Sequence, residues 1–280
     1  MIHIITDSTS GLPAALAQQY HIPVIPQVIL FGDESYLEGV EMDPATFLHR
    51  LRAAKELPKT AAPPPGLFVE QFQRLAGPGN TVLCIHPSAE LSGTVRSALT
   101  AAADFADADI RVLDTRTIAG PLAALVLLAA QWAEQGEGAD TIMARLQALI
   151  PRSHLYFLVD TLEFLQKGGR IGGAAALIGS VLQVKPILEL RDGRVEPLER
   201  ERTQRKALAR LKELTLAQAA RGAESRLSVL HAGAPQAAQA LAGDLGQQLG
   251  VADVMIMDLT PAIVTHAGPG VLGVGFFAEG

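Results

Sequence analysis

Short apolar runs alternate with longer stretches of helical periodicity along the first half of the chain. Apolar, β-branched runs bounded by turn residues predict strands over residues 2–6, 24–31, 81–86 and 110–114. Helical spacing covers residues 12–20, 44–54, 66–75, 92–103, 121–135 and 139–150. Strands that are apolar throughout, with helices between them, indicate a mostly parallel sheet covered by helices on both faces.

The pattern changes at Pro151-Arg-Ser153. Beyond it, the Asp-Gly pair at positions 192–193 separates two strand-like runs and predicts a hairpin. Further strands are expected over residues 155–159, 184–190, 194–201, 227–231 and 254–259, and helices over 161–166, 203–221 and 235–249. The sequence therefore predicts an α/β protein of two lobes. Residues 1–153 form an N-terminal lobe with a mostly parallel sheet flanked by helices, and residues 154–280 form a C-terminal α+β lobe with a mixed sheet.

Composition narrows the class of protein. The chain has 280 residues, of which 49% are hydrophobic and 19% charged, enough for a large core. Its net charge is −6 and its basic residues do not cluster, which gives no support to nucleic-acid binding. One cysteine, Cys84, excludes a disulfide within the chain, fits a reducing compartment and is expected to be core filler.

The apolar stretch 118–133 contains Gly120 and Pro121 and predicts a buried helix with Pro121 near its first turn, not a membrane span. No signal peptide is evident, so we expect a cytoplasmic protein.

The first candidate for chemistry is the segment Ser92-Gly93-Thr94, which follows an apolar strand and opens a predicted helix. Hydroxyls and unpaired backbone N–H groups gather at such an entrance, with the positive end of the helix dipole behind them. That combination favours a carboxylate or phosphate oxygen. Considered alone, Ser92 is better explained as a helix cap.

Two further segments carry polar side chains beside predicted strand ends. Residues 58–66 contain three consecutive prolines and predict a stiff, extended surface segment that holds Thr60 in one place. A rigid connector whose threonine faces water is the equal alternative. His266 lies in Thr265-His-Ala-Gly-Pro-Gly270, where a structural role is the more common one. Together with Ser92, these residues predict one anion-binding point in an apolar protein.

Other motifs suggest less. Residues 268–273 match G-x-G-x-x-G, but no helix, second strand or ribose-binding acid follows them. Residues 167–173 lack the spacing of a phosphate loop. Arg170 within them could pair with a carboxylate of the protein or of a partner, and a structural salt bridge is the default expectation. The segment Asp7-Ser-Thr-Ser10 is expected to cap the helix from Leu12, with Pro13 in its first turn, and Ser8 has no visible base. No metal-binding spacing appears, so neither a metal nor a cofactor is expected.

The ordered motifs of the whole chain resemble one family. They are Ile4-Ile-Thr-Asp-Ser-Thr-Ser10, Pro58-Lys-Thr60, Leu91-Ser-Gly-Thr94, Val112-Leu-Asp-Thr115, Leu165-Gln-Lys-Gly-Gly-Arg-Ile171, Lys185-Pro-Ile187, Arg202-Thr-Gln-Arg-Lys-Ala207 and Thr265-His-Ala-Gly-Pro-Gly270. By these motifs the chain is similar to the DegV family from residue 4 to residue 270. The resemblance implies a two-lobed α/β protein that binds a long-chain fatty acid between its lobes, with the tail in an apolar tunnel. It further implies a FakB-type subunit, itself no enzyme, that presents the acid to an ATP-bearing, FakA-type fatty-acid kinase subunit for acyl-phosphate formation.

The resemblance also implies roles for single residues. Thr60 and Ser92 match the two hydroxyls that hydrogen-bond the carboxylate, Gly93 lies beside Ser92, and His266 matches the histidine of the head-group network. The fatty-acid-binding residues expected from the resemblance also include Gly93 and Arg170, the latter in the K-G-G-R turn. Arg202 matches an arginine that meets the kinase. The family loop usually continues with a serine where this chain has Ala61, which leaves the network one donor short.

Two other functions stay open at this point. One is a stand-alone hydrolase or transferase that uses Ser8 or Ser92 as its nucleophile. The other is a sugar-phosphate or nucleotide binder at the helix entrance of Ser92. The ligand that the protein retains distinguishes all three.

Overall fold

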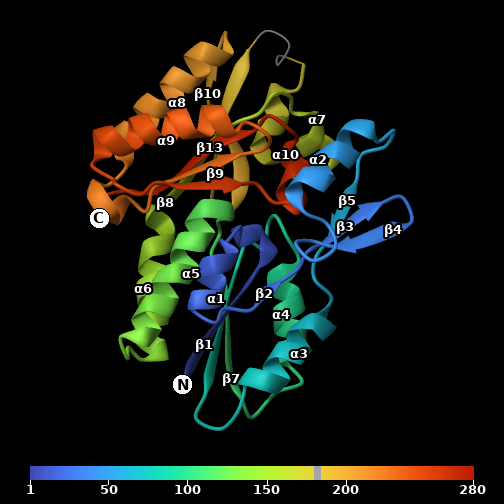
Figure 1. The fold of residues 1–280 in the computed structure, drawn as a ribbon, viewed down its shortest axis with the longest axis vertical. Helices are drawn as coiled ribbons and strands as arrows, with labels where there is room; N and C mark the ends of the chain where they lie inside the picture. The colour runs from blue at the N-terminus through green and yellow to red at the C-terminus, as the bar shows by residue number, and fades with distance from the viewer. Residues whose placement is uncertain (180–183) are drawn as a thin grey trace.

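Figure 1 shows the fold in a computed structural model, which describes residues 1–179 and 184–280. A four-stranded sheet near the N-terminus has the order β2-β1-β6-β7 and is parallel throughout. Its strands are β1 (Ile2–Asp7), β2 (Val24–Ile25), β6 (Thr81–His86) and β7 (Asp109–Asp114). Cys84 of β6 is fully buried and burial raises the pKa of its thiol, which confirms it as a core residue. The predicted parallel sheet is confirmed.

The second half of the chain forms a six-stranded mixed sheet of order β10-β9-β8-β13-β11-β12. Its strands are β8 (Ser153–Leu158), β9 (Lys185–Arg191), β10 (Arg194–Glu201), β11 (Ser228–His231), β12 (Met255–Asp258) and β13 (Leu272–Phe277). β11 and β12 are parallel and the other neighbours antiparallel. The β9–β10 hairpin turns at Asp192 and Gly193, both at positive φ, as the Asp-Gly pair predicted.

A small antiparallel sheet of order β4-β3-β5 was not predicted. It consists of β3 (Val28–Phe31), β4 (Glu34–Leu37) and β5 (Lys59–Ala61). The prediction of one strand over 24–31 is wrong, because Ile25 pairs with β1 whereas Val28 pairs with β4 and β5. Pro26 lies at the break and has no N–H to continue a ladder. The extended segment that carries Thr60 is thus an edge strand.

Helices connect and cover the sheets. They are α1 (Ala14–Gln19), α2 (Pro44–Ala53), α3 (Pro65–Leu75), α4 (Thr94–Ala102), α5 (Ala119–Glu134), α6 (Ala139–Leu149), α7 (Glu163–Lys167), α8 (Gln204–Gln218), α9 (Pro235–Leu249) and α10 (Pro261–Ala267). The helix cap predicted at residues 7–10 is misplaced, since Asp7 caps the short 3-10 turn Ser8–Ser10 and α1 begins later with Pro13 as its N-cap. None of the helices among the described residues is long and apolar enough to span a bilayer.

α5 joins the two halves of the molecule. It contacts both β1 and β13, and Figure 1 shows it between the parallel sheet and the mixed sheet. Eleven of its 16 residues are buried, and Leu122 and Leu125 have no exposed surface. The largest core cluster accordingly contains side chains from both halves, such as Leu83 and Phe277. The predicted buried helix is confirmed, while the division into lobes at 153/154 stays a prediction.

Candidate functional site

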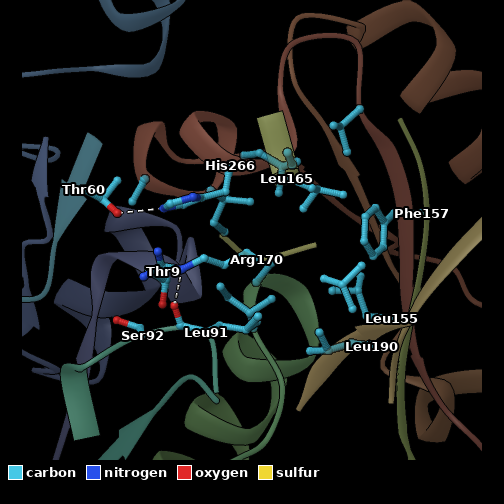
Figure 2. A pocket seen from close by; sticks show the side chains of 18 of the residues that line it. Thr9, Thr60, Leu91, Ser92, Leu155, Phe157, Leu165, Arg170, Leu190 and His266 are labelled. Atoms are coloured by element: carbon cyan, nitrogen blue, oxygen red, sulfur yellow. Dashed lines mark hydrogen bonds between the residues drawn. The ribbon is translucent and has the colours of Figure 1, made fainter. Parts of the chain in front are cut away.

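A cavity of about 920 Å³, including the space at its opening, lies where the sheets meet. Most of its wall is aliphatic or aromatic, and the mixed sheet contributes Leu155, Phe157, Leu190, Val195, Leu230 and Gly273. Polar side chains also line the wall, namely Thr9, Gln27, Thr60, Ser92, Arg170 and His266. Figure 2 shows the labelled polar residues together on one side and Leu155, Phe157 and Leu190 on the other. The cavity is thus amphiphilic, with a polar end and an apolar body.

Thr60 and His266 meet at the polar end although 206 positions separate them. Thr60 lies on the edge strand β5, and His266 lies in the last turn of α10, not at a strand end as expected. Thr60 Oγ1 is 2.8 Å from His266 Nε2 (Figure 2). The buried Nδ1 of His266 has no hydrogen-bond partner in the described part of the chain. The 2.8 Å contact fits either direction, since a neutral imidazole protonated at Nε2 donates to Thr60 Oγ1, whereas one protonated at Nδ1 accepts the Thr60 hydroxyl proton.

The imidazole of His266 is neutral at neutral pH. Burial, and after it the charge of Arg170, lowers the pKa of His266 to about 4. Gly168 allows this placement, because a Cβ at position 168 would lie only 2.2 Å from His266 Nδ1. The ring therefore serves as a hydrogen-bonding group without a charge of its own.

Ser92 and Gly93 lie between β6 and α4, on the opposite side of the polar end from Thr60. α4 begins at Thr94, two residues later than predicted, and Gly93 is its N-cap residue. Ser92 Oγ accepts the backbone N–H of Thr94 at 3.3 Å, so the expected capping role of Ser92 is present in part. A Cβ at Gly93 would lie 3.3 Å from the Cβ of Ala62, so a glycine here lets this loop approach the segment after Thr60 closely.

Arg170 carries the one formal charge among the described residues that line the cavity. Its Nε donates to the carbonyl of Leu91 at 3.0 Å and its Nη1 to the carbonyl of Gly168 at 2.7 Å. The structural salt bridge expected for Arg170 is absent from the described residues. Instead, the guanidinium connects the loop at Leu91 to the turn at Gly168, which packs against His266. It also brings a positive charge to the polar end of the cavity.

The structure does not bring every candidate residue to the cavity. Arg202 is exposed on the turn between β10 and α8 and does not line the cavity. The Ser8 hydroxyl donates to the buried carboxyl of Glu38, whose pKa is raised by burial, and Glu38 accepts the N–H of Ala262 at 2.5 Å. Ser8 therefore helps fix the start of α10. Among the described residues, neither Ser8 nor Ser92 has an imidazole within hydrogen-bond reach.

Sequence reasoning missed two polar lining residues, Thr9 and Gln27. Gln27 follows the break at Pro26 and carries no motif that would have identified it. Over the described ranges 1–179 and 184–280, no group of three or more His, Cys, Asp or Glu side chains is arranged to hold a metal ion. What the residues can do chemically is bind an anionic head group through hydroxyls and one cation while the wall contacts an apolar chain.

The DegV family model matches residues 1–279 of the chain. This chain belongs to the DegV family. Among curated DegV domain-containing proteins, one from Streptomyces coelicolor is 41% identical over 98% of this chain and 97% of its own length. One from Halalkalibacterium halodurans is 38% identical over 99% of both chains.

Solved structures of DegV proteins have the same fold. A fatty-acid-binding DegV family protein from Thermus thermophilus is 32% identical, with a TM-score of 0.91 over 99% of both chains. DegV of Bacillus subtilis, described as a fatty acid binding protein, is 31% identical, with a TM-score of 0.89 over 99% of both chains. The α/β architecture, with its parallel and mixed sheets, is therefore the DegV fold over the whole chain.

Proposed function

We infer that this DegV protein binds a long-chain fatty acid in the cavity. The observation that supports this most strongly is the cavity itself, because hydroxyls, an imidazole and one arginine gather at one end of an otherwise apolar wall. A buried carboxylate needs hydrogen bonds or a counter-charge, and Thr60, Ser92, His266 and Arg170 would supply both, with Gly93 beside them. The fatty-acid-binding relatives from Thermus thermophilus and Bacillus subtilis support the same ligand class.

Burial of the fatty-acid tail would provide most of the binding affinity, and the hydrogen bonds to the carboxylate would fix the orientation of the bound acid. Burying about 16 carbons at ~0.8 kcal/mol per CH₂ gives a gross driving force of order 10 kcal/mol before the ordering costs. Each hydrogen bond to the carboxylate adds roughly 1.5–3 kcal/mol. The expected effect of Ala61 on the head-group network is wrong, because Ala61 is exposed and does not line the cavity, whereas Thr60 and Ala62 do.

Substitution of the two hydroxyls tests this function. Thr60→Ala and Ser92→Ala should each weaken fatty-acid binding and leave the fold intact, measured by competition with a fluorescent fatty-acid analogue. Thr100→Ala is the matched control, because Thr100 is exposed on α4 and its hydroxyl bonds the carbonyl of Arg96 in its own helix. Dissociation constants that stay at the control value in both variants would sink the assignment.

The further step is presentation of the acid to a partner. As in the FakB-type subunits that the motifs resemble, the carboxylate would be offered to a FakA-type kinase subunit that carries ATP, and the chain itself would not be an enzyme. Arg202 suits a partner surface, because it is exposed and lies away from the cavity lining. Its planar guanidinium can pair with a carboxylate in two places at once.

A further inference from the structure

A chain of buried hydrogen bonds runs from the end of β1 to Ser92. The amide nitrogen of Gln27 donates to Asp7 Oδ1 at 3.0 Å and to Thr94 Oγ1 at 2.8 Å. Thr94 Oγ1 in turn lies 2.8 Å from Ser92 Oγ. Asp7, Gln27 and Thr94 are no more than 3% exposed, so bulk water does not compete for these groups.

Asp7 fixes the orientation of the Gln27 amide. Asp7 Oδ1 already accepts the backbone N–H of Thr9 at 3.0 Å, and Asp7 Oδ2 lies 2.8 Å from His86 Nδ1. If the amide were turned over, its oxygen would face another accepting oxygen. The NH₂ group therefore faces Asp7, and its second hydrogen is directed to Thr94.

The direction of each later bond follows from that one. Thr94 Oγ1 accepts from Gln27, and Ser92 Oγ is the one acceptor among the described residues within hydrogen-bond reach of the buried Thr94 hydroxyl proton, so Thr94 donates to Ser92. Ser92 Oγ also accepts the Thr94 backbone N–H, so the Ser92 proton is left for the cavity that this side chain lines. Bonds arranged in such a series polarise one another.

We propose that Asp7, Gln27 and Thr94 are positioning residues that direct the Ser92 hydroxyl proton into the cavity, toward an anionic head group. The proposal rests on the proposed fatty-acid-binding function and adds these three residues to the site. A donor that is already directed before the ligand arrives needs no reordering on binding, which raises the affinity for an anion.

Replacing Gln27 by methionine, of similar shape but without the amide, tests the relay. Affinities are measured for a long-chain fatty acid and for the fatty alcohol of the same length. In Gln27→Met the dissociation constant of the acid should rise about threefold to tenfold, the size of one net hydrogen bond. The dissociation constant of the alcohol should stay near the wild-type value, because its head group carries no charge. Gln131→Met on α5 is the matched control. It removes an amide that lies 3.4 Å from the Tyr20 hydroxyl, and it should change neither the acid affinity nor the alcohol affinity.

A double-mutant cycle separates the relay from a merely structural role. In a Ser92→Ala background Gln27→Met should cause no further loss of acid affinity, since the hydroxyl through which it acts is gone. If Gln27→Met does not fold, Thr94→Val carries the same test, and Thr94→Ser should restore the wild-type ratio of acid to alcohol affinity. Equal losses for acid and alcohol, or full additivity with Ser92→Ala, would overturn the relay while the acid-binding function stands. A wild-type protein that binds neither ligand would instead contradict the proposed function, and the relay with it.

Discussion

Gly168 offers a test of the head-group geometry that replaces none of the polar residues. Its φ of −77° suits any residue, and besides His266 the new Cβ would lie 3.0 Å from the carbonyl oxygen of Phe164. The new Cβ would lie 2.2 Å from His266 Nδ1, whereas ordinary contact begins at 3.4 Å, so the ring must move by more than an ångström. That shift breaks the 2.8 Å hydrogen bond to Thr60 and misplaces both groups. The loss of one bond to an ionised head group is roughly 1.5–3 kcal/mol, or about 10-fold to 150-fold in the dissociation constant.

The assay is competition of a fatty acid with a fluorescent analogue on purified Gly168→Ala. Gly243→Ala in α9 is the control, because its Cβ would meet no atom within 4 Å and it lies outside the cavity. We expect the control to bind with wild-type affinity. If Gly168→Ala kept that affinity as well, with an unchanged Tm, the placement of His266 in the head-group site would be refuted.

Three other predictions concern the protonation of His266, the contact of Arg202 with a partner, and the packing of α5 in the core. The pKa of His266 is lowered from 6.5 to about 4, so the unfolded chain binds more protons in that window and the free energy of unfolding falls as the pH falls. In His266→Gln, the free energy of unfolding measured with urea should fall less steeply as the pH is lowered. The same pH dependence in the variant and the wild type would contradict the lowered pKa of His266. Arg202→Ala should retain fatty acid yet support little acyl-phosphate formation with a FakA-type partner, because a charge at the rim of an interface mainly affects the rate at which the two proteins associate. The acyl phosphate is measured by trapping it with hydroxylamine. Wild-type turnover or lost lipid would contradict that role. Leu122 has no exposed surface, so Leu122→Ala should lower the free energy of unfolding by about 2–5 kcal/mol. Leu99 is 54% exposed, so Leu99→Ala should lower it by about 0.5 kcal/mol or less. Equal losses in chemical denaturation would argue against the core position of α5.

Much of the fold was predictable because its signals are local. The apolar run of β6 predicts a buried parallel strand, the Asp-Gly pair at 192–193 predicts its hairpin, and α5 is apolar on every side because two sheets cover it. The position of Ser92 before a helix and the extended segment around Thr60 were equally readable, since each depends on neighbouring residues.

The remaining features depend on contacts between distant parts of the chain. The small sheet that holds Thr60 pairs Lys59–Ala61 with a strand about 30 positions earlier, and periodicity carries no record of such pairing. His266 was expected at a strand end, but the run 262–277 contains both a short helix and a strand, and one apolar pattern suits either. Gln27 bonds Asp7 and Thr94 only because three segments converge.

Identification of the bound ligand tests the central claim most directly. Delipidated protein would be incubated with an equimolar mixture of long-chain fatty acid, fatty alcohol, nucleotide and sugar phosphate, separated from unbound compounds and extracted for mass spectrometry. The account predicts about one molecule of fatty acid per chain, because one cavity combines an apolar wall with a polar end, and it predicts little of the others. Retention of a nucleotide or sugar phosphate, or of acid and alcohol in equal amounts, would contradict it.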